Sequence, residues 1–301
     1  MNELVDRDQR RVIGPGDVVA VTGAAGGIGR TTARALVAAG LRVVAVDRRA
    51  ADGVGAERSL VGDLRDPEFV ASALTGPDGP VDAVVHLAAI PAPGFVPDDQ
   101  TLIQNVHTAF LVLDGAGRAG ARTAVAASSV SRYGYAWAGR ELSPPYVPVD
   151  EAQPTVAVDS YGLSKVLGEE VGAFAWRRWG MPCTLLRFPF VGEGERLAAH
   201  LERVRRDPGV NRRELWAWLD TRDAAGAVLA ALRSGLTGYH ALNVAAPDSA
   251  SDVPNAELFA RYHPATELRA GLGAFGSALD SSAARELIGF RAEHGWRAAS
   301  A

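Results

Sequence analysis

Apolar and polar positions alternate in a regular rhythm over the first two thirds of the chain. Short, continuous apolar runs rich in β-branched residues recur at 17–24, 41–47, 58–64, 81–89 and 122–129. Stretches between several of these runs, such as 27–40, 67–75 and 101–119, have the periodicity of helices. Strands that are apolar throughout are typical of a parallel sheet covered on both faces. The pattern predicts an α/β fold with a doubly wound, Rossmann-type parallel sheet.

The rhythm loosens beyond residue 187. A helix that begins near Ser160 leads into a strand at 182–188. The later pattern predicts a helix at 194–206, a strand at 214–220, a helix at 221–234, a strand at 239–246, and helices near 254–262 and 280–288. We therefore expect a dinucleotide-binding domain over 1–187, to which 221–247 returns. Segments 188–220 and 248–301 are expected to form a small, interleaved C-terminal substrate lobe.

Composition narrows the classes of protein. With 48% hydrophobic and 22% charged residues and a net charge of −4, the chain has an ordinary globular core and no basic surplus for nucleic acid or anionic membranes. The single cysteine, Cys183, excludes an internal disulfide and lies in an apolar run typical of a buried strand. We expect a cytoplasmic protein, because we find neither a signal peptide nor an apolar run of roughly 20 residues that could cross a membrane.

Lys165 is the only lysine among the 31 basic residues, so the other thirty are arginines. It follows Tyr161 by four residues, which places both side chains on one face of a helix. Arginine is a planar fork that stays charged, whereas lysine is a compact ammonium whose pKa moves readily on burial. The pair therefore indicates a site that needs a point charge and a mobile proton.

The segment TGAAGGIG places Gly23, Gly26 and Gly29 between the first strand and the first helix. Such glycines allow a tight turn and a close approach of the backbone to a pyrophosphate at the helix N-terminus. Asp47 ends the second strand, where a carboxylate can accept both ribose hydroxyls and repels a 2′-phosphate. Arg48 and its neighbour Arg49 could instead accept that phosphate. On balance the pattern favours NAD over NADP.

The order of these and later motifs resembles the extended short-chain dehydrogenase/reductase superfamily, in its NAD-dependent epimerase/dehydratase branch. The resemblance covers nearly the whole chain and rests on TGAAGGIG, GDLRD, HLAA, SSVSRYG, YGLSK, LRFP, WLDTRDAA and DSSAARELIGF. It implies a homodimer formed through helices of the dinucleotide-binding domain. The implied cofactor contacts are Gly23, Ala25, Gly26, Gly27, Ile28, Gly29, Asp47, Arg48, Asp63, Leu64, Leu87, Ala88, Ala89, Asn105, Ser128, Tyr161, Lys165 and Phe188.

The resemblance also implies a catalytic set of Ser129, Tyr161 and Lys165, with Asn105 on a neighbouring helix. A tyrosine has a pKa near 10, so we expect the Lys165 ammonium and the positive nicotinamide to lower the pKa of Tyr161 toward that of a useful base. Ser129 rather than Ser128 would hold the substrate oxygen, because it stands at the family's distance from Tyr133 and Gly134. 

The expected substrate contacts are Ser129, Ser131, Tyr161, Arg187 and Arg222. Either of the two arginines could instead pair with a buried carboxylate such as Asp223. The six histidines, His86 included, lack metal-ligand spacing, so we assign no metal site. We interpret Trp216 and Trp218 as core packing in preference to a sugar platform.

Two departures from the family pattern bear on the reaction. The family's sugar dehydratases resemble one another in having an Asp-Glu pair directly after the catalytic Ser or Thr. Val130 and Ser131 occupy those positions here, so a β-elimination would lack side chains that carry its protons. The stretch after Arg187 lacks the family's nucleotide-sugar segment. The leading interpretation is an NAD-dependent oxidoreductase acting on a secondary alcohol or ketone, with a sugar or sugar acid as substrate. A nucleotide-sugar 4-epimerase with tightly held NAD is the alternative, and a cofactor-sensing binding protein is the third.

Overall fold

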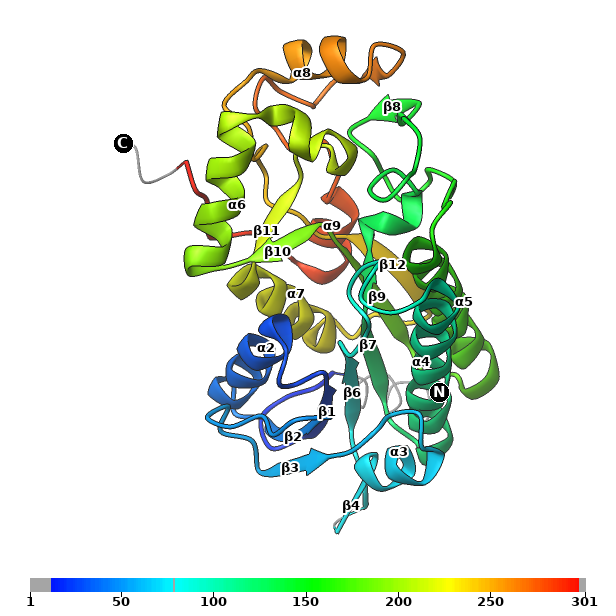
Figure 1. Cartoon of the computed structure of the whole chain (residues 1–301). Coiled ribbons are helices and arrows are strands. Elements are labelled where there is room, and N and C mark those ends of the chain that lie inside the picture. The colour runs from blue at the N-terminus through cyan, green and yellow to red at the C-terminus, as the bar shows by residue number, and fades with distance from the viewer. Residues whose placement is uncertain (1–11, 78, 298–301) are drawn as a thin grey trace, which may run out of the picture.

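The computed structural model describes residues 12–77 and 79–297. In this part of the chain a seven-stranded parallel sheet runs in the order β12-β9-β7-β6-β1-β2-β3 (Figure 1). Its strands are β1 (Val18–Thr22), β2 (Arg42–Asp47), β3 (Arg58–Val61), β6 (Ala83–His86), β7 (Thr123–Ser129), β9 (Cys183–Phe188) and β12 (Tyr239–Asn243). The predicted doubly wound sheet is confirmed.

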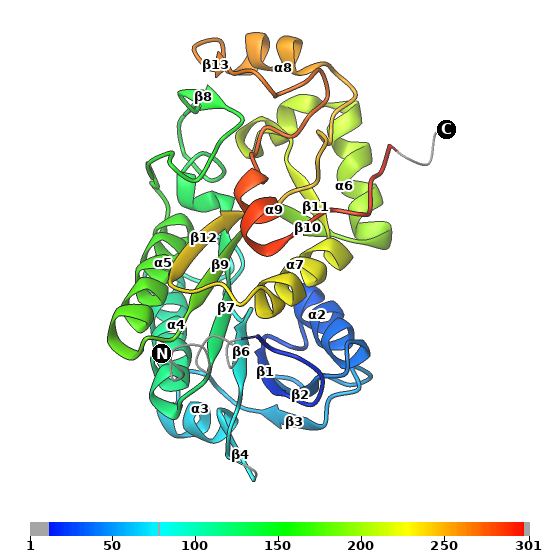
Figure 2. The same cartoon turned by 180° about the vertical axis from the view of Figure 1, so that it is seen from behind.

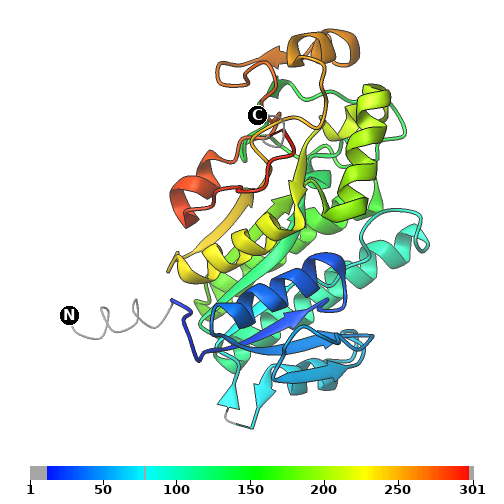
Figure 3. The same cartoon turned by 90° about the vertical axis from the view of Figure 1, so that its left-hand side faces the viewer.

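Helices cover both faces of the sheet. The helices α2 (Gly27–Ala38), α7 (Thr221–Arg233) and α9 (Ser282–Ile288) lie on one face, and α3 (Pro67–Ala73), α4 (Asp98–Ala119) and α5 (Ser160–Trp179) lie on the other. Figure 3 shows α2 and α7 side by side across the first face. Successive strand residues point to opposite faces: Val19 and Val21 pack under α2, whereas Ala20 packs in the core on the α4 side. This two-sided burial explains why the strands are apolar throughout.

The chain reverses its direction of strand addition at β1. From β1 it moves outward through β2 to β3, and then returns to place β6 on the other side of β1. The loops that leave the carboxyl ends of β1 and β6 therefore run to opposite faces of the sheet. A crevice at such a reversal is where open α/β sheets bind their ligands. Thr22 and His86 are paired at this edge.

A second layer of structure sits above the carboxyl ends of the strands (Figure 2). It contains the parallel pairs β10 (Phe190–Gly192) with β11 (Trp218–Asp220) and β8 (Tyr146–Val147) with β13 (Glu267–Leu268), the helices α6 (Gly194–Arg206) and α8 (Asn255–Tyr262), and the 3-10 helices η1 (Val130–Tyr133) and η2 (Pro208–Glu214). A short hairpin of β4 (Thr75–Gly76) and β5 (Gly79–Pro80) lies at the opposite edge. Trp216 and Trp218, 0% and 1% exposed, lie in the core of this lobe, as predicted.

The structure differs from the expected elements at three points. The strand expected at 214–220 begins only at Trp218, because Leu215 and Trp216 adopt left-handed backbone angles that end η2 and break an extended run. The last helix, α9, packs against α7 and β12 instead of the lobe, since Ala284 and Ile288 join the core of the sheet. Conversely, residues around Tyr133 and Val147 join the core of the lobe.

Cys183 is a buried free thiol in β9, as predicted, and burial raises its pKa to about 12. Among the described residues, no helix combines the length and apolar character required to span a bilayer.

Candidate active site

The loop between β1 and α2 requires glycine at two positions. Gly23 has φ +74°, and a Cβ there would lie 2.7 Å from the backbone nitrogen of Ala88. A Cβ on Gly29 would lie 2.0 Å from the carbonyl oxygen of Gly23. The loop is therefore folded tightly on itself and against the segment 87–89 that follows β6. Ala88 and Ala89 continue from there to the wall of a small cavity beside Lys165.

The outer side of this loop is open. Apart from Gly27 itself, its chain neighbours and the adjoining backbone of α2, no atom of the described residues lies within 4 Å of a Cβ built on Gly27. The cap residue of α2, Gly26, provides no side chain to bond the first-turn N–H groups of the helix. An open cradle of backbone donors at a helix N-terminus suits a pyrophosphate, so the residues present fit a dinucleotide. Ile28 turns inward and packs against the core of the sheet.

Asp47 lies at the end of β2, beside this loop. Its Oδ2 accepts from the backbone nitrogen of Ala25 at 3.0 Å, and its Oδ1 accepts from the backbone nitrogen of Arg49 at 3.1 Å. The carboxylate is thus fixed beside the glycine loop by two backbone N–H groups. Arg48 is exposed beside it. This is the placement expected for a group that selects between NAD and NADP.

The GDLRD segment follows β3 on the same side of the crevice. The Asp63 carboxylate is bound by the guanidinium of Arg65, which holds the pKa of Asp63 below its usual range. The adjacent Leu64 is only 7% exposed. The Asp63 side chain is thus already engaged by an arginine, and the expected contact of Asp63 and Leu64 with the cofactor stays a prediction.

The structure brings Ser129, Tyr161 and Lys165 together. Ser129 ends β7, while Tyr161 and Lys165 lie in the first turns of α5, and all three are at most 9% exposed. Asp159 caps α5 by accepting from the backbone nitrogen of Gly162 at 2.7 Å, which starts the helix directly before Tyr161. The Ser129 hydroxyl acts on the Tyr161 phenol, whose pKa it lowers against the effect of burial. The Lys165 ammonium donates to the carbonyl oxygen of Ala127 at 3.0 Å and lies 5.5 Å from the centre of the Tyr161 ring.

The pKa values of this group differ from the expectation. Burial raises the pKa of Tyr161 to about 12, and the hydrogen bond with Ser129 only partly opposes this effect. Burial lowers the pKa of Lys165 to about 8, against the influence of the Glu169 carboxylate. In the chain without a nicotinamide, burial therefore outweighs the expected lowering of the Tyr161 pKa, and the lowering by Lys165 and a bound nicotinamide together stays a prediction. Loss of solvent disfavours the phenolate more strongly than Ser129 favours it.

Asn105 lies on α4 and joins the loop after β6 to α5. Its Oδ1 accepts from the backbone nitrogen of Ile90 at 2.8 Å, and its Nδ2 donates to the Ile90 carbonyl oxygen and to Ser164 Oγ, both at 3.1 Å. Ser164 Oγ in turn donates to the carbonyl oxygen of Tyr161 at 2.7 Å. The amide is thus fully used in holding the Tyr161 turn against α4.

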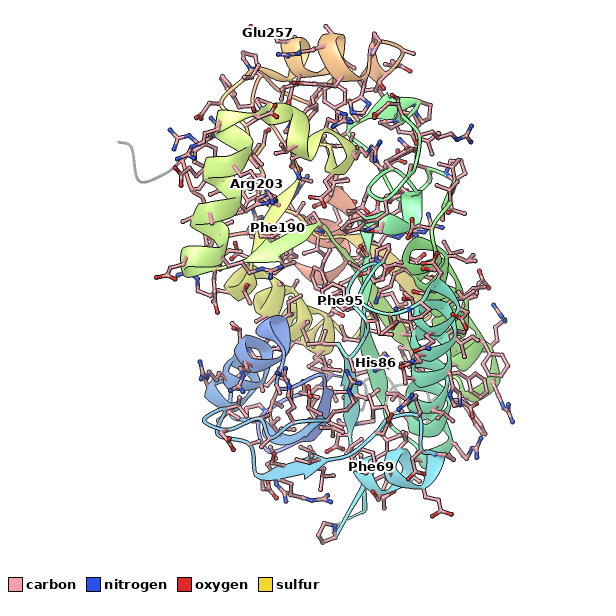
Figure 4. The ribbon with its side chains drawn as sticks, viewed as in Figure 1. Phe69, His86, Phe95, Phe190, Arg203 and Glu257 are labelled. Carbon is pink, nitrogen blue, oxygen red and sulfur yellow. The ribbon has the colours of Figure 1, made fainter. Side chains whose placement is uncertain are left out.

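His86 stands at the end of β6, where Figure 4 labels it. Its Nδ1 is 2.8 Å from Thr22 Oγ1. Burial, aided by the charge of Lys165, lowers the pKa of His86 to about 3, so the ring is neutral at physiological pH. Within residues 12–77 and 79–297, no group of three or more His, Cys, Asp or Glu side chains is placed to hold a metal ion.

Like Asp63 and Asn105, three further expected ligand contacts are engaged inside the protein. Arg187 binds the buried carboxylate of Glu169 through its Nε and Nη2, both at 2.8 Å. The alternative that Arg187 pairs with a buried carboxylate is therefore the observed one, with Glu169 in place of Asp223, and a direct substrate contact is not supported. Ser128 Oγ donates to the same carboxylate at 2.7 Å. Phe188 is 4% exposed and packs in the core of the sheet.

The remaining substrate candidates lie above the strand ends. Ser131 is 5% exposed, and its backbone nitrogen donates to Ser129 Oγ at 3.1 Å. Arg222 binds Asp220 through Nε and Nη2 at 2.9 and 2.8 Å, yet its side chain is 55% exposed. Asp223 instead receives hydrogen bonds from Glu293 and His294 and anchors the C-terminal segment. Arg222 is therefore oriented by Asp220 but not enclosed.

Glu169 was not among the predicted site residues. It is 4% exposed and stands one helical turn beyond Lys165, so that Tyr161, Lys165 and Glu169 form a row along one face of α5. The spacing of four residues was the available signal. The same spacing is common on exposed helix faces, and only the sheet shows that this face is buried.

Comparisons with known proteins agree with this geometry. Residues 19–245 match the family described as NAD dependent epimerase/dehydratase. A UDP-glucose 4-epimerase of Azospirillum brasilense is 32% identical over 201 residues, which cover 62% of this chain and 55% of that protein. An L-arabinose 1-dehydrogenase (NAD(P)(+)) of Haloferax volcanii is 30% identical over 223 residues, covering 72% of this chain and 83% of that one.

The matches to UDP-glucose 4-epimerases span about half the length of those proteins. Among solved structures, a short-chain dehydrogenase/reductase superfamily protein from Agrobacterium tumefaciens with bound NAD superposes with a TM-score of 0.70 and 26% identity over 92% of this chain and 93% of that one. MoeE5 in complex with UDP-glucose and NAD superposes with a TM-score of 0.69 and 25% identity, over 94% of this chain and 95% of that one.

Proposed function

Because the chain belongs to the NAD dependent epimerase/dehydratase family, we propose that it is an NAD-dependent oxidoreductase acting on a secondary alcohol or its ketone, with a free sugar or sugar acid as substrate. NAD is the family's cofactor, and when bound it supplies the hydride acceptor or donor. The observation that carries the proposal is the burial of Ser129, Tyr161 and Lys165 where β7 ends and α5 begins, with the Lys165 ammonium 5.5 Å from the centre of the Tyr161 ring.

Each residue of this group has a separate task in the proposed reaction. Ser129 holds the substrate oxygen by a hydrogen bond, which fixes the reacting carbon near the cofactor crevice. Tyr161 removes the alcohol proton, or returns it in the reductive direction. Lys165 supplies positive charge beside the phenol and can release a proton itself, since burial lowers its pKa to about 8. Gly26, Gly27 and Asp47 would hold the pyrophosphate and the adenosine ribose.

The small-substrate proposal draws on the charges of the lobe. Four of the six arginines between 188 and 220 bind carboxylates of the protein itself: Arg205 binds Asp252, Arg206 binds Glu202, and both Arg212 and Arg213 bind Glu141. These cations are largely compensated and are poorly suited to grip a diphosphate. The uptake of a nucleotide diphosphate would require several of these ion pairs to open.

A nucleotide-sugar 4-epimerase is the second candidate, because UDP-glucose 4-epimerases are among the relatives. Purification followed by identification of any retained dinucleotide separates the two. If NAD exchanges easily and is reduced to NADH in the presence of a sugar, the result supports the dehydrogenase. Tightly held NAD with no net reduction, together with interconversion of UDP-sugars, supports the epimerase. A cofactor-sensing protein would bind NAD and show neither activity.

We also propose that the protein is a homodimer in the cytoplasm. Exposed apolar side chains gather on α4 and α5, namely Ile103, Phe110, Leu163 and Leu167, which are 62%, 37%, 40% and 38% exposed. An apolar patch across two packed helices is typical of a protein–protein interface. Sedimentation velocity of the wild type and of Leu167→Asp tests this, because a dimer through this face should dissociate in the variant.

A further inference from the structure

Two hydrogen bonds join the end of β7 to α5, and they involve neighbouring residues on both elements. Lys165 Nζ donates to the carbonyl oxygen of Ala127 at 3.0 Å, and Ser128 Oγ donates to Glu169 Oε1 at 2.7 Å. Lys165 and Glu169 are one helical turn apart, whereas Ala127 and Ser128 are consecutive. The strand is thus held at two points immediately before Ser129.

The carboxylate at the second point is itself fixed. Arg187 binds it through two parallel hydrogen bonds of 2.8 Å, and Arg132 Nε lies 3.2 Å from its Oε2. Arg187 is on β9, directly opposite Ser128 in the register of the sheet. Glu169 and Arg187 are 4% and 5% exposed. A bidentate pair has a defined orientation, so Ser128 is bound to a rigid acceptor.

The chain after Ser129 is held by the same pair. Tyr133 ends the 3-10 helix that begins at Val130, and its hydroxyl accepts from Arg187 Nη1 at 2.9 Å. The same hydroxyl donates to Asn243 Oδ1 at 2.8 Å. Ser129 therefore lies between Ser128, which is bound to Glu169, and Tyr133, which is bound to Arg187.

We propose that the buried Glu169–Arg187 pair is a positioning device for Ser129, which aligns its hydroxyl with Tyr161. Neither partner touches the substrate or cofactor in this role, so both are positioning residues. The inference rests on the proposed function, because it assumes that Ser129 and Tyr161 act on a substrate.

A purely structural role for the pair makes a different prediction. Replacing a buried ion pair by apolar residues of similar volume is often neutral or stabilising, because both charges lose their hydration when buried. If the pair only fills the space between β9 and α5, its joint removal should leave turnover unchanged. If it positions Ser129, turnover should fall although the fold persists.

The test uses two variants of the full-length protein, measured with NAD and the best sugar substrate. Ser128→Ala removes one hydrogen bond and leaves the ion pair intact. The double variant Glu169→Leu/Arg187→Met removes both charges together. The matched control is Asp114→Asn, which removes the charge of a buried carboxylate. Asp114 lies on α4 and is bound by Arg118 and by Trp179 Nε1 at the far end of α5. Melting temperature, the dissociation constant of NAD, KM and kcat are measured for each.

We expect Ser128→Ala and the double variant to lower kcat by about tenfold or more, the scale of a misplaced reacting group, with the NAD dissociation constant unchanged. The Asp114→Asn control should keep its kcat. Undiminished kcat in Ser128→Ala and in a folded double variant would overturn the proposal. A loss of NAD affinity in Ser128→Ala would also overturn it, since Ser128 would then be a cofactor contact. If the double variant does not fold, the kcat of Ser128→Ala by itself supports or overturns the proposal.

Tyr161→Phe is measured together with these variants, so that failure of the proposed function can be distinguished from failure of the positioning role. If the wild type shows no turnover with NAD and any sugar or sugar acid, the proposed function fails, and if Tyr161→Phe retains turnover, the role of Tyr161 in it fails. If Tyr161→Phe is inactive while Ser128→Ala and the double variant turn over normally, only the positioning role fails.

Discussion

Replacing Lys165 by methionine should separate the effect of this lysine on the stability of the fold from its effect on turnover. The side chain is 8% exposed, and burial lowers its pKa to about 8, whereas a free lysine has a pKa near 10.4. At neutral pH the folded protein therefore holds a charged ammonium in a site that favours the neutral amine. Methionine has a similar length and no charge, so it removes this cost.

The sign and size follow from proton linkage. Between about pH 8 and about pH 10.4 the unfolded chain binds more protons at this lysine than the folded chain does, so the free energy of unfolding of the wild type rises with pH. The difference between the two pKa values corresponds to roughly 3 kcal/mol at 1.36 kcal/mol per pH unit. The stability of the methionine variant relative to wild type is therefore highest below about pH 8. That relative stability should decline by roughly 2 kcal/mol between about pH 7 and about pH 9.5.

Urea unfolding of both proteins at several pH values measures this difference. The lost hydrogen bond to Ala127 and any change in packing shift the stability by an amount that does not depend on pH, so the pH dependence isolates the charge. Arg206→Met, which removes an exposed cation, is the control and should differ from wild type by the same amount at every pH. A constant difference between the methionine variant and wild type over this range would refute the account of Lys165. Turnover of the methionine variant should be lost at every pH.

Four further predictions concern the site. Tyr161→Phe should leave NAD affinity nearly unchanged and lower turnover by about a hundredfold, the scale of a lost acid–base group, and steady-state kinetics with a fluorescence titration of NADH will measure both. Lys165→Arg should be nearly as inactive as Lys165→Ala, because the guanidinium keeps the charge but neither fits nor releases a proton; substantial turnover of the arginine variant would contradict this. Asp47→Ala should narrow the preference for NAD over NADP in kcat/KM, and a wild type that prefers NADP would transfer the adenosine contact to Arg48 and Arg49. Calorimetry of the NAD-loaded protein with UDP, UDP-glucose and UDP-galactose should detect no tight binding, whereas micromolar binding would favour the epimerase.

The local signals in the sequence were sufficient for the sheet and for the parts of the site that lie within one element or one turn. The continuous apolar runs predicted β1, β2, β6, β7 and β9, because a strand buried on both faces favours apolar side chains along most of its length. The tight glycine loop followed from the positions of Gly23 and Gly29. The common face of Tyr161 and Lys165 followed from the helical repeat.

Partners that come from distant parts of the chain could not be read from these signals. Ser128 and Glu169 are 41 residues apart, and Tyr133 and Arg187 are 54 apart. The sequence left open whether Arg187 binds substrate or a carboxylate, and named Asp223 as one such carboxylate. The register of β7 beside β9 decides in favour of Glu169, because it places Arg187 against Ser128 and under α5.

The protonation state of the site was also beyond the sequence. From the residue types alone, an ammonium near a phenol lowers the pKa of the phenol. In the folded chain both groups are enclosed by α4, α5 and the sheet, and this enclosure raises the pKa of Tyr161 to about 12 while it lowers that of Lys165 to about 8. Residue types and spacing determine which chemical groups meet. Their pKa values depend on how much solvent all the surrounding elements exclude, and only the tertiary structure decides that.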